Sequence, residues 1–113
     1  STLFPYTTLF RLNSEYVKFV NDIINKNFEG YEEEEIMNIL TESKQKFERL
    51  MEETNKVEIE EENGIFLKDV KYSVMDGLFL AIDLYNFYYS KQLERFKMRG
   101  VNYIRKGRVT SFF

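Results

Sequence analysis

The 113-residue sequence contains no cysteine, no histidine and no tryptophan, and Pro5 is its only proline. Without cysteine the chain forms no disulfide and offers no thiolate to a metal ion. Without histidine it lacks the commonest general base and metal ligand. Its five glycines are scattered, so the sequence has no glycine-rich loop that would bind phosphate. We therefore expect a protein that is not an enzyme and that has no cofactor and no metal site.

Long apolar runs are also absent. The longest uncharged apolar run, Gly77 to Ile82, is far too short to cross a bilayer. No charged-then-apolar segment of the signal-peptide type opens the chain, so we do not expect export. Apolar residues make up 43% of the sequence and charged residues 31%, which is typical of a folded globular domain. We expect residues 12–113 to form one compact cytoplasmic domain with no membrane partner.

Charge is divided unevenly along the chain. Residues 91–113 hold seven basic residues and one acid, a net charge of +6. The overall net charge is −3, so the first ninety residues, with nine basic and eighteen acidic groups, carry −9. Such a division indicates a segment that attracts an anionic partner or complements a neighbouring subunit.

The first eleven residues, STLFPYTTLFR, resemble the translation of a widely used short-read sequencing adapter. The resemblance implies a gene assembled from metagenomic reads and gives no protein family. We expect residues 1–11 to be an adapter-derived or disordered arm that contributes little to stability. The alternatives are a native extended arm, or apolar side chains of this segment lodged in a groove.

Two amphipathic helices are predicted before residue 56. The first covers about residues 14–28, is capped by Asn13 or Ser14 and ends at Gly30. The second covers about residues 32–55. Its apolar positions repeat at three- and four-residue steps: Ile36, Ile39, Leu40, Ser43, Phe47, Leu50, Met51 and Thr54.

The longest predicted helix covers residues 72–99, with Ser73 and Asp76 as a capping box and Gly100 as its end. One apolar stripe on it consists of Met75, Leu78, Ile82, Tyr85, Tyr89, Leu93 and Phe96. A second consists of Ala81, Leu84 and Tyr88. A helix that is apolar over so much of its circumference needs neighbours on two sides.

Short β-hairpins are predicted on both sides of this helix. Residues 57–67 alternate apolar and polar side chains around Asn63-Gly64, although a frayed end of the second helix would also fit. Residues 101–105 and 108–112 flank Lys106-Gly107 in a similar way. The expected fold class is mainly α: a three-helix core with a long central C-terminal helix and one or two short β-hairpins, with α+β as the alternative.

Aromatic residues nearly encircle the long helix at Tyr85, Phe87, Tyr88 and Tyr89. Two neighbouring helices would not cover them all, and an exposed aromatic patch usually marks an interface. We expect a homo-oligomer, most simply a dimer, or a protein partner at these residues. The alternative is that the hairpins alone cover them.

The basic C-terminal end is a candidate site for nucleic acid or a nucleotide. Clustered arginine and lysine bind phosphates, and an adjacent aromatic ring stacks on bases. The basic residues also suit a helix C-terminus through its dipole, or pairing with acidic residues of another subunit. The candidate residues are Arg95, Arg99, Tyr103, Arg105, Lys106 and Arg108.

Two acidic groups have competing interpretations. Glu32, Glu33, Glu34 and Glu35 form a candidate partner surface, but carboxylates at the start of a helix also complement its dipole. Asp69, Asp76 and Asp83 lie at seven-residue spacing, which arises easily on the polar side of a helix, so we expect no metal there.

The function expected from these features is that of a non-catalytic, oligomerising protein–protein interaction module. An acidic nucleic-acid mimic encoded by a phage or mobile element, acting as an inhibitor of a host defence system as anti-CRISPR proteins do, fits this description. The alternative is nucleic-acid or nucleotide binding through the basic C-terminal helix end and hairpin.

Overall fold

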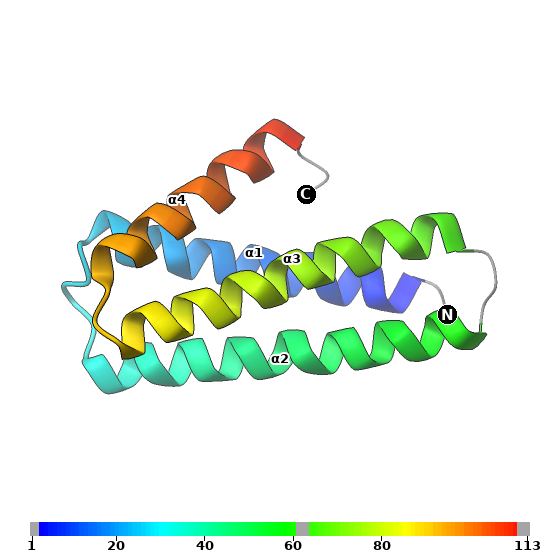
Figure 1. Ribbon diagram of the computed structural model, residues 1–113, viewed down its shortest axis with the longest axis horizontal. Coiled ribbons are helices and arrows are strands. Elements are labelled where there is room, and N and C mark those ends of the chain that lie inside the picture. Colours follow the sequence, from blue (N-terminus) through cyan, green and yellow to red (C-terminus); the bar gives the residue numbers. More distant parts are fainter. Residues whose placement is uncertain (1–2, 61–63, 111–113) are drawn as a thin grey trace.

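The computed structural model describes residues 3–60 and 64–110, and over these residues the chain is helical with no strand (Figure 1). The four helices are α1 (Leu3–Asn25), α2 (Glu33–Glu60), α3 (Gly64–Tyr89) and α4 (Leu93–Thr110). The prediction of a mainly α protein is confirmed.

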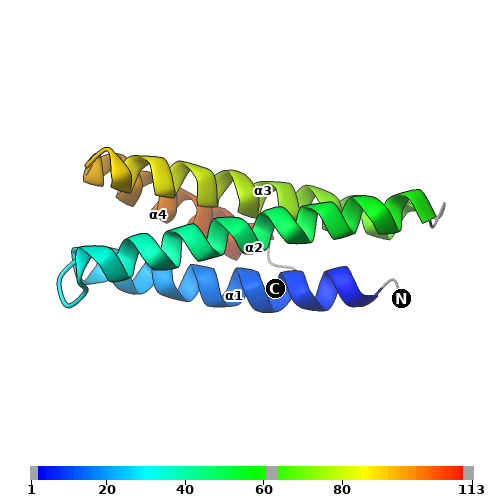
Figure 2. The same cartoon turned by 90° about the horizontal axis from the view of Figure 1, so that it is seen from below.

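The first three helices form an up-down-up arrangement, and α4 turns back beside α3. Contact is most extensive between α2 and α3, whereas α4 packs on α1 and α3 and, within the described ranges, not on α2. The far end of α4 diverges from α3 (Figure 1). Seen from below, α3 lies along one edge of the molecule with no helix beyond it (Figure 2).

The core lies where the four helices meet, and most of its side chains come from the predicted stripes. The α2 stripe is confirmed, because six of its eight positions are buried, including Thr54, whose hydroxyl donates to the Leu50 carbonyl at 2.7 Å. The buried apolar residues are Leu9, Leu12, Tyr16, Val20, Ile23, Ile36, Leu40, Phe47, Leu50, Val70, Val74, Leu80, Ala81, Leu84 and Phe96.

Two glycines within helices set the helix spacing. A Cβ on Gly77 of α3 would lie 2.3 Å from Cε1 of Phe47 in α2. A Cβ on Gly100 of α4 would lie 2.7 Å from Cδ1 of Ile24 and 2.9 Å from Cγ1 of Val20, both in α1. The predicted role of Gly100 as a helix end is therefore wrong: it is a buried helical residue at which α4 approaches α1.

The predicted helix over residues 72–99 is not continuous. It ends at Tyr89, and Lys91 has φ +62°. The amide of Gln92 donates to the Phe87 carbonyl at 2.7 Å, and that of Lys91 donates to Tyr88 at 3.0 Å. This pair of bonds is a Schellman motif with lysine at the position that usually holds glycine. The break went unpredicted because no glycine or proline marks it.

Both predicted hairpins are wrong where the structure describes them. Val57 ends up in the last turns of α2 and residues 64–67 in the first turns of α3, while residues 61–63 lie outside the described ranges. Residues 101–110 continue α4 without a turn, and 111–113 lie outside. Alternating side chains over so few residues also fit a helix, and here the helix prevails.

Helix boundaries differ in three further places. The first helix begins at Leu3 and ends at Asn25, not at residues 14 and 28. It ends in a second Schellman motif, in which the left-handed residue Asn27 (φ 52°) follows and Phe28 donates to the Ile23 carbonyl at 2.9 Å. Ser73 lies inside α3, so the predicted capping box is not formed.

Residues 3–11 are part of α1, and Leu9 is 1% exposed. The extended or disordered arm expected at this segment is therefore not seen over the residues described.

Candidate interaction surface

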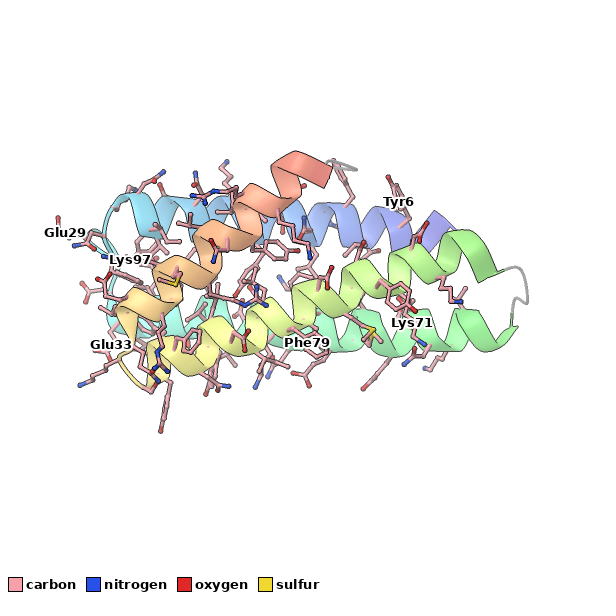
Figure 3. All side chains as sticks on the ribbon, turned by 45° about the horizontal axis from the view of Figure 1, so that its top comes forward. Tyr6, Glu29, Glu33, Lys71, Phe79 and Lys97 are labelled. Atoms are coloured by element: carbon pink, nitrogen blue, oxygen red, sulfur yellow. The ribbon has the colours of Figure 1, made fainter. Side chains whose placement is uncertain are left out.

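The outer face of α3 carries a stripe of large side chains that the other described helices leave half-buried or exposed. Tyr72 is 54% exposed, Phe79 50% and Tyr89 71%, while Met75 and Ile82 are half-buried and Asn86 is exposed. We refer to these six residues as the α3 outer face. The label of Phe79 in Figure 3 marks its centre.

The α3 outer face has the spacing of a coiled-coil seam. Its residues follow each other at steps of three, four, three, four and three, which are the a and d positions of a heptad. Tyr72, Phe79 and Asn86 take the a positions, and the others take d. An asparagine at one a position is the residue that commonly fixes the register of paired helices. Over 17 steps the face is about 26 Å long.

The predicted apolar stripe of Met75, Leu78, Ile82, Tyr85, Tyr89, Leu93 and Phe96 was expected to be covered by neighbouring helices, and this expectation is partly wrong. Met75, Ile82 and Tyr89 point away from the bundle, whereas Val70, Val74 and Ala81 point into it. Apolar residues cover both sides of α3, so their spacing alone does not show which side faces α2. Tyr72 and Phe79 were not singled out, although their heptad spacing was a detectable signal.

One edge of the α3 outer face is acidic. Asp69, Asp76 and Asp83 all take the e position of the heptad, on the side toward α4. Asp83 accepts a hydrogen bond from Nε of Arg99 at 2.8 Å, while Asp69 and Asp76 are exposed. Among the described residues no cluster of three acidic side chains could hold a metal ion. The aspartates are spread along the helix edge.

The predicted anion-binding residues divide between two sides of α4. Arg95, Arg105 and Lys106 are exposed on its outward side, together with Met98, which is 67% exposed. Arg95 and Arg105 make no ion pair with any residue in the ranges described. The side chain of Arg108 lies outside the described ones.

The other two predicted residues face the bundle. Tyr103 donates to Oδ1 of Asn13 in α1 at 2.8 Å, and Arg99 pairs with Asp83 in α3. Burial raises the pKa of Tyr103 to about 12, with the charge of Asp76 adding to the rise. Neither side chain is therefore free to stack on a base or bind an external phosphate, and among the side chains described up to residue 107 the outward side of α4 carries no aromatic ring.

A buried hydroxyl without a partner lies beside these two residues. Tyr16 of α1 is 2% exposed, and its OH has no hydrogen-bond partner among the described atoms. Burial raises the pKa of Tyr16, and the neighbouring Tyr103 raises it further. The contact of α4 with α1 is thus apolar at Gly100, whereas at Tyr16 it leaves a buried hydroxyl without a hydrogen bond.

The predicted aromatic interface is mostly covered within one chain. The ring centroid of Tyr88 lies 6.0 Å from that of Phe28 and 6.2 Å from that of Phe96. Tyr85 is half-buried, with Nζ of Lys44 4.7 Å from its ring, and Phe87 is half-buried against the core. Only Tyr89 of the four is exposed. Phe28, together with Phe96 of α4, covers Tyr88, for which we expected a second copy or a partner or, as the alternative, the hairpins.

Glu32, Glu33, Glu34 and Glu35 are all exposed. Glu32 accepts through its carbonyl from the Ile36 amide at 3.0 Å, which places the next three carboxylates in the first turn of α2. They complement the helix dipole there. They also form no ion pair with the described residues, so their charge is available to a partner.

A hollow between α1 and α2 has mixed charge. Three basic and two acidic side chains line it, so its charge does not favour one kind of ligand. The lining residues are Thr8, Arg11, Leu12, Glu15, Lys46, Arg49, Leu50 and Glu53.

No helix in the described ranges is both long and apolar enough to cross a membrane. No protein family model, curated protein or solved structure matches this chain.

Proposed function

We propose that this chain is a non-catalytic interaction module that binds a helix of a partner protein on the α3 outer face. The observation that supports the proposal is the exposed a and d positions of α3, where Tyr72 and Phe79 are each about half exposed. Aromatic side chains of this size contribute much of the binding energy when a partner covers them.

The acidic edge of the α3 outer face indicates the chemistry of the partner. Asp69 and Asp76 are exposed along one edge, at the position that faces the charged edge of a paired helix. A helix with apolar residues at heptad spacing and lysine or arginine on the adjoining edge would therefore complement α3 in shape and charge. An acidic helix would be rejected, because like charges would be brought together.

Site-specific photo-crosslinking tests this proposal. A benzophenone side chain is placed at Phe79 on the α3 outer face and, as a matched control, at Met98, another exposed apolar residue on α4. We expect a discrete protein adduct from position 79 and none from position 98 in an extract of expressing cells. An excess of unlabelled protein should suppress the adduct, and an excess of Ile82→Asp protein should not.

Adducts of equal yield from both positions, or none from position 79, would contradict the proposal. So would equal competition by the unlabelled protein and its Ile82→Asp variant, since binding would then not depend on the heptad positions.

The finer role expected from the sequence belongs to this proposal. A partner that handles nucleic acid, such as a host defence nuclease, would present basic side chains, and the exposed carboxylates of Glu32–Glu35 support attraction to it. Replacing all four by glutamine should weaken the complex, most strongly at low salt, without changing the melting temperature by more than a few degrees. An unchanged affinity would remove the acidic mimicry from the proposal.

A second candidate function is nucleic-acid binding by the outward side of α4, which the exposed Arg95 and Arg105 favour. Fluorescence anisotropy with a labelled 20-base-pair duplex at two salt concentrations tests it. Binding that weakens steeply with salt and is lost in Arg95→Ala/Arg105→Ala would support this candidate. Binding that survives the double substitution, or no binding, would eliminate it.

A further inference from the structure

The connection between α3 and α4 consists of Ser90, Lys91 and Gln92, and its geometry is unfavourable for these residues. Lys91 has φ +62°, a conformation in which a Cβ crowds the following carbonyl and which glycine adopts without that cost. The backbone preference of lysine therefore opposes the reversal of the chain, which is stabilised by the packing of α4 and by hydrogen bonds such as that from Gln92 to the Phe87 carbonyl.

Nothing in the connection prevents a continuous helix. It contains no glycine or proline, and Oγ of Ser90 already donates to the Asn86 carbonyl at 2.7 Å, as serine does inside helices. The apolar residues on both sides keep one helical register, since Tyr85, Tyr89, Leu93 and Phe96 follow at steps of four, four and three. The same sequence therefore fits one helix over residues 64–110.

In that extended form α4 would leave its own bundle and need an equivalent site. Phe96 is fully buried and Gly100 is buried against Val20 and Ile24. A second copy of this chain offers the same surfaces to Phe96 and Gly100, and its Asn13 can accept the hydrogen bond from Tyr103. A second copy can therefore restore every contact, with only the conformation of the connection changed.

The interface between α4 and the rest of the bundle would have to open, and not every polar group in it has a buried hydrogen-bond partner. The Tyr16 hydroxyl is buried there without a partner, and the Arg99–Asp83 pair is open to water, with side chains 31% and 43% exposed. Both features make the α4 contact easier to separate than an interface that is dry and fully paired.

We propose that two copies of this chain exchange α4, with α3 and α4 joined into one helix through residues 90–92 and each α4 packed on α1 and α3 of the other copy. This inference is independent of the proposed function, because it rests on residues 90–92 and on the contacts of α4, whereas the proposed function rests on the exposed Tyr72 and Phe79.

Because the chain has no cysteine, a designed disulfide can report where α4 packs. A Cβ at position 100 would lie 2.9 Å from Cγ1 of Val20, so Val20→Cys/Gly100→Cys places two sulfur atoms within bonding reach. Protein refolded at increasing concentration and then oxidised is separated on a non-reducing gel. We expect a covalent dimer whose share rises with concentration, beside an internally linked monomer.

Substitution of Lys91 supplies the matched comparison. Lys91→Ala favours the continuous helix and should raise the dimer share severalfold, whereas Lys91→Gly relieves the left-handed position and should lower it. Phe79→Asp should leave the share unchanged. The same ranking should appear in the masses of the cysteine-free Lys91→Ala and Lys91→Gly proteins measured by light scattering, which covers the case in which the cysteine pair fails to fold.

Internally linked monomer alone at every concentration, in the Lys91→Ala background as well, would overturn the exchange. So would a dimer by mass that contains only internal links, or one abolished by Phe79→Asp, because the copies would then associate with α4 in place. If the cysteine pair fails to fold, monomeric masses for both Lys91 variants would overturn it.

Discussion

Gly77 and Gly100 are residues at which the missing side chain, not a special backbone angle, decides the structure. Each lies within a helix, where alanine is normally preferred over glycine by roughly 1 kcal/mol. At both positions, however, a Cβ would come within 3 Å of side-chain atoms on another helix. The helices would have to separate or the neighbouring side chains would have to move. Packing therefore favours glycine at these positions, whereas helix propensity favours alanine.

We predict that Gly77→Ala lowers the free energy of unfolding by about 2 kcal/mol, because Phe47 is fully buried and has no space to yield. The control is Gly107→Ala in α4, where a Cβ would have no atom within 4 Å. That substitution should stabilise the protein by roughly 0.5–1 kcal/mol. Urea denaturation of both variants measures the difference, and equal effects of the two would contradict the packing argument.

Tyr16 and Tyr103 form a second pair of contrasting residues. Removing the unpartnered hydroxyl in Tyr16→Phe should leave the free energy of unfolding unchanged or raise it by about 1 kcal/mol. Removing the hydroxyl that donates to Asn13 in Tyr103→Phe should lower it by roughly 0.5–1.5 kcal/mol. Thermal denaturation of both variants tests this, and a marked loss in Tyr16→Phe would show that its hydroxyl has a partner in solution.

Among the helices, α2 was predicted well and α3 was not, for reasons visible in their residues. In α2 only one side is apolar, so the step from Ile36 to Leu40, Phe47 and Leu50 identifies the buried side. In α3 the core side and the outer face are both apolar, and periodicity does not distinguish them. The end of α3 at Tyr89, before the left-handed Lys91, depends on the docking of α4, a tertiary effect that no local pattern contains.

The left-handed lysine at the α3–α4 junction gives an element-level prediction. Lys91→Gly should raise the free energy of unfolding by about 1 kcal/mol, because glycine adopts this conformation without a Cβ clash. Arg95→Gly, three residues into α4, should lower it by a similar amount, since that position is regular helix. Chemical denaturation measures both, and a loss in Lys91→Gly would show that the turn is not formed as described.

The beginning of α1 gives another prediction. Leu9 is 1% exposed, so Leu9→Ala should lower the free energy of unfolding by roughly 2–4 kcal/mol, whereas Arg11→Ala, at an exposed position, should change it by less than about 0.5 kcal/mol. Such a result would make residues 3–11 a structural part of the domain. If Leu9→Ala were as mild as Arg11→Ala, the expectation that this segment contributes little would hold.

For the molecule as a whole, the distribution of charge along the sequence translates only partly into surfaces. The basic residues of the last segment divide between the outward side of α4 and internal partners such as Asp83. The aromatic residues divide similarly, with Tyr88 packed inside and Tyr89 outside. Composition and spacing identified the clustered basic and aromatic residues, but the direction in which each of these side chains points depends on how α4 folds back onto the bundle.

The tyrosines beneath α4 predict how the whole fold responds to alkali. Burial raises the pKa of Tyr103 from 10.0 to about 12 and also raises that of Tyr16, so the folded state holds these protons more tightly than the unfolded chain does. Their contribution is fully present below pH 10 and is lost as the pH rises toward 12. Unfolding curves measured over this pH range should show that the free energy of unfolding falls more steeply in the unaltered protein than in Tyr103→Phe.

The hydrogen bond between Asn13 and Tyr103 joins residues ninety positions apart in the sequence. During synthesis, α1 is therefore made long before the helix that shields Val20 and Ile24, and these two side chains stay open to water while the intervening residues are added. The nascent chain consequently passes through a period in which this apolar surface is available to chaperones, and any ribosome that stalls before residue 100 leaves it exposed.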